Sequence, residues 1–222
     1  MMSSQIVKVL HAEFITTDVR RFLIEKPASY HFLPGQATDL AINSPGLENE
    51  LRPFTFTSLN ESSYLEFIIK IYDRHDGITK RLATIGAGDE LIIYEAFGTI
   101  SYKRPGLFLA GGAGITPFIA IFRQLKLTGS PDENILLFAN RAETDIILPE
   151  ELRELLGENY VDVIERPIAK EASGRLIDLG LLRNYADEKK YYYICGPEAF
   201  TKAMVEMLHS LGAKSNRIVL EA

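Results

Sequence analysis

The sequence predicts two domains: an N-terminal antiparallel six-stranded β-barrel and a C-terminal α/β domain built on a parallel, doubly wound sheet. Three observations predict this fold class. Short strand-like segments separated by turns fill the first hundred residues, apolar strands alternate with helical segments further on, and Lys103, Arg104, Pro105 and Gly106 mark the change. The predicted domains are residues 1–104 and 105–222.

The N-terminal domain contains six segments of strand character. In chain order they are QIVKVLHAEFIT, RRFLIE, QATDLAIN, RPFTFTS, YLEFIIKIY and DELIIYE, and the connections include PG, NSPG, NESS and GAGD. Such short strands favour an antiparallel barrel or sandwich. GITKRLATIG is different because Ile78, Leu82 and Ile85 recur at helical spacing, which predicts a short helix across the barrel.

The C-terminal domain alternates strands with helices. The predicted strands are GLFLA, NILLFAN, YVDVIE, YYYIC and RIVLE. The helical segments between them are TPFIAIFRQLKL, LPEELRELLG, IDLGLLRNY and EAFTKAMVEMLHSLG. This alternation is typical of a parallel sheet covered by helices on both faces.

Composition excludes several classes of function. The chain has 222 residues, 46% of them hydrophobic, and a net charge of −6 without a basic cluster, so it should bury a sizeable core and not bind nucleic acid. No apolar run approaches the ~20 residues that cross a bilayer, and the N-terminus lacks a signal-peptide pattern. We therefore expect a cytoplasmic protein with no membrane partner; the oligomeric state is not predicted.

A single cysteine, Cys195, limits the redox chemistry. One thiol cannot form an internal disulfide, hold an iron–sulfur cluster through four thiolates, or build a cysteine-rich zinc site, and no metal site is expected. Redox chemistry would therefore use a bound organic cofactor or a partner.

Three motifs suggest ligand binding. GGAGITP, from Gly111 to Pro117, lies between a strand and a helix, where glycine backbone and a helix N-terminus suit a pyrophosphate; the alternative is an ordinary tight turn. RPFTFTS offers a guanidinium, aromatic rings and hydroxyls along one strand, although an ordinary strand would look similar. YYYICGPEAF ends a buried strand at Cys195, at the sheet edge where ligands bind, but a lone cysteine is often only a small buried hydrophobe.

Taken together, and over the full length, these motifs resemble the ferredoxin-NADP reductase family in its short bacterial single-chain form. FLPGQ is similar to the family's PGQ turn, RPFTFTS to its flavin motif, and HDGIT to its second flavin segment. GDELIIYEAFGTI, GGAGITP, CGPEAF and the terminal LEA follow in the family's order. The resemblance implies an FAD-binding barrel followed by an NAD(P)-binding α/β domain.

On the flavin side, the resemblance implies that Arg52 binds the flavin pyrophosphate and that Thr55 hydrogen-bonds near flavin N5. Phe54 replaces the family's tyrosine, so a hydroxyl is lost while ring packing is kept. The other implied flavin-side candidates are Pro53, Lys70, Tyr72, Gly77, Ile78 and Thr79. The alternative to a flavin-binding role is that Lys70 is an ordinary solvated lysine and Tyr72 an ordinary surface tyrosine.

On the nucleotide side, the resemblance implies that Cys195 and Glu221 flank the nicotinamide, as catalytic residues together with Thr55. The implied cradle for the dinucleotide consists of Gly112, Gly114, Thr116, Cys195 and Gly196. Phe200 replaces a methionine, and Ala222 stands where an aromatic often covers the flavin. Arg166 and Arg175 match positions that bind a 2′-phosphate in NADP-preferring relatives, so NADPH is expected over NADH.

The resemblance therefore implies an FAD-dependent NAD(P)H oxidoreductase that passes hydride to flavin N5 and then single electrons to a separate flavodoxin or ferredoxin. Arg74, His75, Lys80 and Arg81 could form a basic docking patch for such an acidic partner, or simply a solvated helix face. The alternatives are a reductase of free flavin, an electron-transfer subunit with another acceptor, and a nucleotide-binding module without flavin.

Overall fold

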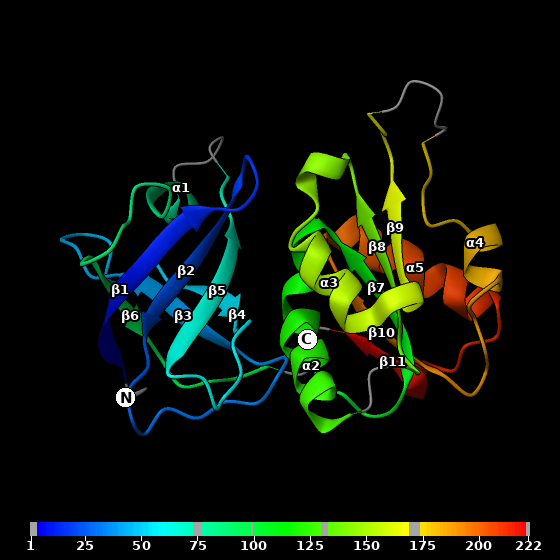
Figure 1. The fold of residues 1–222 in the computed structure, drawn as a ribbon, viewed down its shortest axis with the longest axis horizontal. Helices are drawn as coiled ribbons and strands as arrows, with labels where there is room; N and C mark the ends of the chain where they lie inside the picture. The colour runs from blue at the N-terminus through cyan, green and yellow to red at the C-terminus, as the bar shows by residue number, and fades with distance from the viewer. Residues whose placement is uncertain (1–3, 73–76, 99, 130–132, 169–173, 221–222) are drawn as a thin grey trace.

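The computed structural model describes residues 4–72, 77–98, 100–129, 133–168 and 174–220, and contains two sheets (Figure 1). The first has six antiparallel strands in the order β4-β3-β6-β1-β2-β5. Its strands are β1 (Gln5–Phe14), β2 (Val19–Glu25), β3 (Ala37–Ile42), β4 (Arg52–Thr55), β5 (Tyr64–Lys70) and β6 (Glu90–Ile93). A bridge between Phe56 and Phe67 joins the two edges, so the sheet is a nearly closed barrel, as the sequence predicts.

Aromatic packing fills the barrel. Phe56 stacks on Phe32 with ring centroids 4.2 Å apart and also contacts Phe67 at 5.0 Å. The predicted short helix is α1 (Ile78–Arg81), and Ile78 and Leu82 are buried in the same core. Arg20 holds the end of this helix, because its Nη1 donates hydrogen bonds to the carbonyls of Leu82, Ala83 and Ile85.

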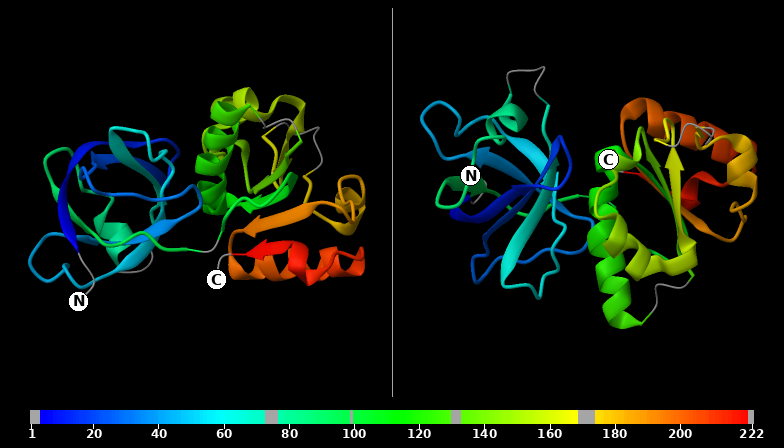
Figure 2. Two further views of the ribbon diagram at one scale, coloured as in Figure 1. Left: turned by 90° about the horizontal axis from the view of Figure 1, so that it is seen from below. Right: turned by 45° about the horizontal axis from the view of Figure 1, so that its top comes forward.

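The second sheet is parallel, with the order β11-β10-β7-β8-β9. Its strands are β7 (Gly106–Gly111), β8 (Ile135–Asn140), β9 (Tyr160–Ile164), β10 (Tyr191–Cys195) and β11 (Ile218–Leu220). The helices are α2 (Thr116–Thr128), α3 (Pro149–Leu156), α4 (Leu179–Arg183) and α5 (Glu198–Ser210). The core on one face includes α2 and α3, and the core on the other includes α4 and α5, so the predicted doubly wound arrangement is confirmed (Figures 1 and 2).

Helix α2 lies between the barrel and the parallel sheet (Figure 2). Val19 and Ile68 of the barrel belong to the same buried cluster as Phe118 and Phe122 of α2. This shared apolar contact fixes the two sheets side by side. It also places the N-terminus of α2 near β4 and β5, the strands on which the flavin motifs lie.

The connection between the sheets is held by a tyrosine of β10. Tyr193 Oη accepts hydrogen bonds from the backbone N–H groups of Lys103 and Arg104, at 2.9 and 3.1 Å, and donates one to the carbonyl of Arg104 at 2.8 Å. The predicted domain boundary at residue 104 remains a prediction. Within the described ranges, no helix combines the length and apolar character needed to cross a membrane.

Candidate functional site

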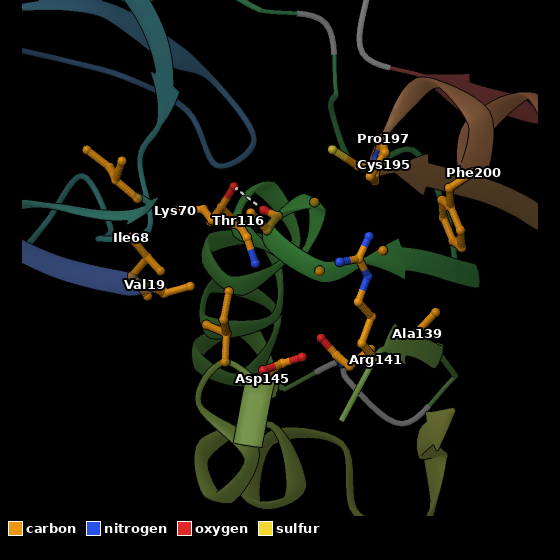
Figure 3. A pocket seen from close by; sticks show the side chains of 18 of the residues that line it. Val19, Ile68, Lys70, Thr116, Ala139, Arg141, Asp145, Cys195, Pro197 and Phe200 are labelled. Atoms are coloured by element: carbon orange, nitrogen blue, oxygen red, sulfur yellow. Dashed lines mark hydrogen bonds between the residues drawn. The ribbon is translucent and has the colours of Figure 1, made fainter. Parts of the chain in front are cut away.

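A cavity of about 730 Å³ opens between the barrel and the parallel sheet (Figure 3). On the barrel side it is lined by residues of β2, β4, β5 and α1, and on the other side by residues at or just after the carboxyl ends of β7, β8, β9 and β10. Ligands of open α/β sheets bind at this edge. The fold therefore brings the flavin motif and the glycine-rich motif, more than fifty residues apart in the chain, to one cavity.

The glycine-rich turn forms the floor of the cavity. Gly112 has a φ of +53°, in the left-handed region that favours glycine. A Cβ on Gly111 would approach the ring of Phe200 to 3.1 Å, so this position is also closely packed. Thr116 begins α2, and its hydroxyl donates to the carbonyl of Ala113 at 3.1 Å. The backbone in this segment can approach a ligand more closely than side chains would allow.

The barrel wall contributes Pro53, Phe54 and Thr55 of β4, together with Lys70, Tyr72 and Thr79. Lys70 also forms an ion pair with Asp18, with 2.8 Å between Nζ and Oδ2. Figure 3 shows Ile68 and Lys70 on this wall, with Cys195, Pro197 and Phe200 across the cavity. A flat ring system between the two walls would contact apolar and polar groups from both sides.

Three predicted flavin residues lie elsewhere. Arg52 does not line the cavity; its side chain is exposed and its Nη1 donates to the carbonyl of Leu51 at 2.7 Å. Ile78 points into the barrel core, so only its backbone can serve a ligand. Gly77 precedes α1 in extended conformation and is also outside the lining.

The far end of the cavity carries a polar group that lies outside the three sequence motifs. Asn140, the last residue of β8, is buried, and neither its Oδ1 nor its Nδ2 has a hydrogen-bond partner in the described part of the chain. A buried amide without partners costs on the order of 1 to 3 kcal/mol, which a ligand with complementary groups would recover. Its position at the carboxyl end of a buried strand is the signal that could have identified it.

Charged residues line the same cavity as Asn140. Arg141, Asp145 and Glu165 line the cavity, and Figure 3 shows the side chain of Arg141 extending toward the glycine-rich turn. Arg166 instead has a side chain that is 78% exposed and lies 3.5 Å from the carboxylate of its neighbour Glu165. Neither Arg166 nor Arg175 lines the cavity.

Comparison with known proteins decides the family. Residues 6–102 match the family model of an oxidoreductase FAD-binding domain, and residues 108–206 match that of an oxidoreductase NAD-binding domain. NADH-cytochrome b5 reductase 1 of Coccidioides immitis is 30% identical over 90% of this chain and 72% of its own length. The chain belongs to the ferredoxin-NADP reductase family.

The chain spans different shares of the length of its relatives. The reductase component of propane 2-monooxygenase from Rhodococcus jostii is 28% identical over 95% of this chain, which spans only 61% of that protein. A ferredoxin NADP+ reductase from Neisseria gonorrhoeae, with bound FAD and NADP, has the same fold, with a TM-score of 0.83 and 22% identity over 99% of this chain and 98% of that one. The chain is accordingly an oxidoreductase with FAD- and NAD-binding domains.

Several motif residues of this ferredoxin-NADP reductase family member do line the cavity. Cys195, which is buried, lies beside Gly196 and Pro197, so the end of β10 forms the wall opposite β4. The predicted cradle residues Gly112, Gly114 and Thr116 are all present at the floor. Glu221 lies outside the described residues, as do Ala222, Arg74 and His75, so their predicted roles remain predictions.

Proposed function

We propose that the chain passes a hydride from a nicotinamide nucleotide, preferably NADH, to bound FAD, and then single electrons to a separate flavodoxin or ferredoxin. One observation supports this most directly. A single cavity is lined by Thr55 of β4 and by Cys195 of β10, so a flavin on the barrel wall and a nicotinamide on the opposite wall would face each other.

The residues around the cavity suit both the flavin and the nicotinamide nucleotide. A Cβ on Gly112 would meet nothing within 4 Å, so the backbone there is open to a pyrophosphate, and Gly114 also lines the cavity. The side-chain amide of Asn140, which has no hydrogen-bond partner among the described residues, offers an NH2 donor group and a carbonyl acceptor to a nucleotide. Thr55, Lys70 and Thr79 provide hydroxyl and ammonium groups on the flavin side. When bound, FAD accepts a hydride at N5 and can release electrons one at a time.

The chain itself supplies positioning. The Thr55 hydroxyl would donate a hydrogen bond near flavin N5, and Cys195 would orient the nicotinamide without acting as a nucleophile. Glu221 would act beside them, and Arg52 would reach the flavin pyrophosphate by turning away from its contact with Leu51. Geometry of this kind accounts for much of the rate of a hydride transfer, because the reacting atoms must be held about 3 to 3.5 Å apart.

The preference for NADH follows from the charges that line the cavity. The carboxylate of Glu165 can accept hydrogen bonds from the ribose hydroxyls of NADH, and it would repel the 2′-phosphate of NADPH. Arg166 and Arg175, on which the expectation of NADPH rested, lie outside the lining, and Arg141 extends toward the glycine-rich turn, where a pyrophosphate would lie. The b5 reductases similar to this chain are also named as NADH enzymes.

For the acceptor, the supporting feature is the exposed pair Lys80 and Arg81 on α1, next to Thr79 of the cavity. Flavodoxins and ferredoxins are usually acidic, and cations at the rim of a docking surface mainly raise the association rate. A Lys80→Glu/Arg81→Glu variant should reduce such an acceptor slowly and with weak salt dependence, while its flavin is reduced by NADH normally. Lys189→Glu/Lys214→Glu, which makes the same charge change elsewhere on the surface, is the control. An equal loss of acceptor reduction rate in the two double variants would contradict this docking site.

The visible spectrum of the purified protein, recorded anaerobically with NADH and separately with NADPH, tests the whole proposal. We expect a yellow protein that NADH bleaches rapidly and NADPH slowly. A protein that stays colourless after addition of FAD would overturn the flavoenzyme assignment, and faster bleaching by NADPH would overturn the nucleotide preference.

A further inference from the structure

A carboxylate is fully buried where the barrel meets α2. Glu66, on β5, is 0% exposed. Its Oε1 accepts a hydrogen bond from Arg123 Nη1 at 2.6 Å and one from the Thr57 hydroxyl at 2.8 Å, and its Oε2 lies 2.6 Å from Arg21 Nη2. Burial alone would raise the pKa of Glu66, but Arg123 and Arg21 more than offset this and lower it, so the carboxylate is ionised at neutral pH.

Arg123 connects three elements through one guanidinium. Its Nη1 reaches Glu66 and also donates to the carbonyl of Thr57 at 2.7 Å, both in the barrel. Its Nε and Nη2 donate to the two carboxylate oxygens of Glu151 on α3, at 2.6 and 2.9 Å. A planar guanidinium held on two sides has a fixed orientation, unlike a lysine ammonium.

This cluster is close in sequence to residues that line the cavity. Thr57 is two residues beyond Thr55, and Glu66 is two residues before Ile68, so both flavin-side strands are held by residues next to cavity positions. Arg123 is two turns along α2 from Thr116, at the floor of the cavity, a distance of roughly 10 Å along a helix axis. The cluster thus joins the helix that begins at the nucleotide cradle to the strands of the flavin wall, and none of Arg123, Glu66, Thr57 and Glu151 lines the cavity.

We propose that Arg123 is a positioning residue that sets the distance and angle between the nucleotide-binding turn and the flavin wall. This inference rests on the proposed hydride transfer. The apolar contacts of Val19 and Ile68 with α2 hold the two parts together, but such contacts do not fix a direction. The hydrogen bonds of Arg123 are directional and do fix the orientation of the two parts. This matters because misplacement of reacting groups by 1 Å can slow a reaction by roughly 10²-fold.

The test uses Arg123→Met and Arg123→Lys in the flavin-loaded protein. The rate of flavin bleaching at saturating NADH, measured anaerobically in a stopped-flow instrument, should fall at least about tenfold in both, because lysine cannot reproduce the fork of hydrogen bonds. Flavin content and the Kd for NADH should change little. The charge-transfer absorbance between bound nucleotide and flavin, which reports ring stacking, should weaken.

Arg153→Met is the matched control. Arg153 is also held by a carboxylate, Asp162 at 3.1 Å, but both residues belong to the parallel-sheet half and the arginine is half exposed. We expect its bleaching rate to equal that of the unchanged protein. Glu151→Gln provides a milder variant if the Arg123 variants do not fold, and its bleaching rate should also fall.

The outcomes separate the two proposals. If the unchanged protein is not bleached by either nucleotide, the proposed function fails, and the role of Arg123 with it. If the unchanged protein bleaches and folded, flavin-loaded Arg123 or Glu151 variants bleach equally fast, only the positioning role is overturned, and the cluster is structural.

Discussion

Gly114 lies against Cys195 so closely that a Cβ on Gly114 would approach the Cys195 carbonyl oxygen to 2.3 Å. The glycine-rich turn after β7 and the end of β10 are therefore packed backbone to backbone at the floor of the cavity. No side chain fits at Gly114 without moving one of these two segments. Two motifs that are 81 residues apart in the sequence thus form one surface.

Gly114→Ala should weaken nucleotide binding, because the turn must shift away from Cys195 to accommodate the methyl group. We expect the Kd for NADH to rise at least about tenfold, or 1.4 kcal/mol, with FAD retained because the barrel is not disturbed. Gly86→Ala is the control, since a Cβ there meets nothing within 4 Å. An unchanged Kd in a titration of Gly114→Ala would show that the turn does not contact the nucleotide.

Asn140→Leu should have opposite effects on stability and binding. The substitution removes a buried amide that has no hydrogen-bond partner in the described part of the chain, so the free energy of unfolding without nucleotide should be unchanged or higher. NADH, in contrast, should bind about 1 to 3 kcal/mol more weakly. Urea unfolding and nucleotide titration on the same preparation measure both. A destabilised protein with normal affinity would show that the amide serves the fold.

Glu165→Gln should improve the use of NADPH. Removing the carboxylate charge from the cavity should lower the KM for NADPH severalfold and raise that for NADH modestly. Arg166→Ala, at the adjacent exposed position, should change the two KM values equally and slightly. A large loss confined to NADPH in Arg166→Ala would restore the sequence-based expectation that this arginine binds the 2′-phosphate.

Arg52→Ala should weaken retention of FAD if the guanidinium binds the flavin pyrophosphate. A charge-assisted contact of this kind contributes about 1.5 to 3 kcal/mol, so part of the flavin should be lost during gel filtration. Arg183→Ala, an exposed arginine at the end of α4, is the control. Full flavin content in Arg52→Ala would exclude Arg52 from the site.

Stability should fall in acid because of Glu66. Its pKa is lowered in the folded protein below the ordinary value of 4.5, so its ion pairs contribute stability above about that pH and lose it as the pH falls through the folded pKa. Glu66→Gln removes the buried carboxylate charge that faces Arg123 and Arg21. Because Arg123 keeps its two hydrogen bonds to Glu151, the cost at pH 7 should be smaller than the ~3 to 5 kcal/mol expected for a buried charge left without any partner. The free energy of unfolding of this variant should also depend less on pH below 4.5 than that of the unchanged chain. If the free energies of unfolding of the two proteins changed with pH in parallel, the lowered pKa of Glu66 would be contradicted.

The sequence alone determined the fold class and the location of the main motifs. Alternating apolar residues predicted the barrel strands, and apolar runs followed by helical spacing predicted the parallel sheet, because these periodicities reflect which faces are buried. The glycine turn from Gly111 and the strand ending at Cys195 were identified for local reasons, namely backbone freedom and position at a strand end. The resemblance of these motifs to the ferredoxin-NADP reductase family was confirmed by the domain matches.

Which side chains meet becomes visible in the folded chain. Asn140 and Glu165 reach the cavity while Arg52 and Arg166 do not, because orientation depends on packing between strands and on partners distant in the chain. The contact of Arg123 with Glu66 joins residues 57 positions apart on an α-helix and a β-strand, and no local periodicity encodes such a pair. Local sequence patterns specify burial within each element, whereas charge pairing between elements is settled only when the two sheets pack against α2.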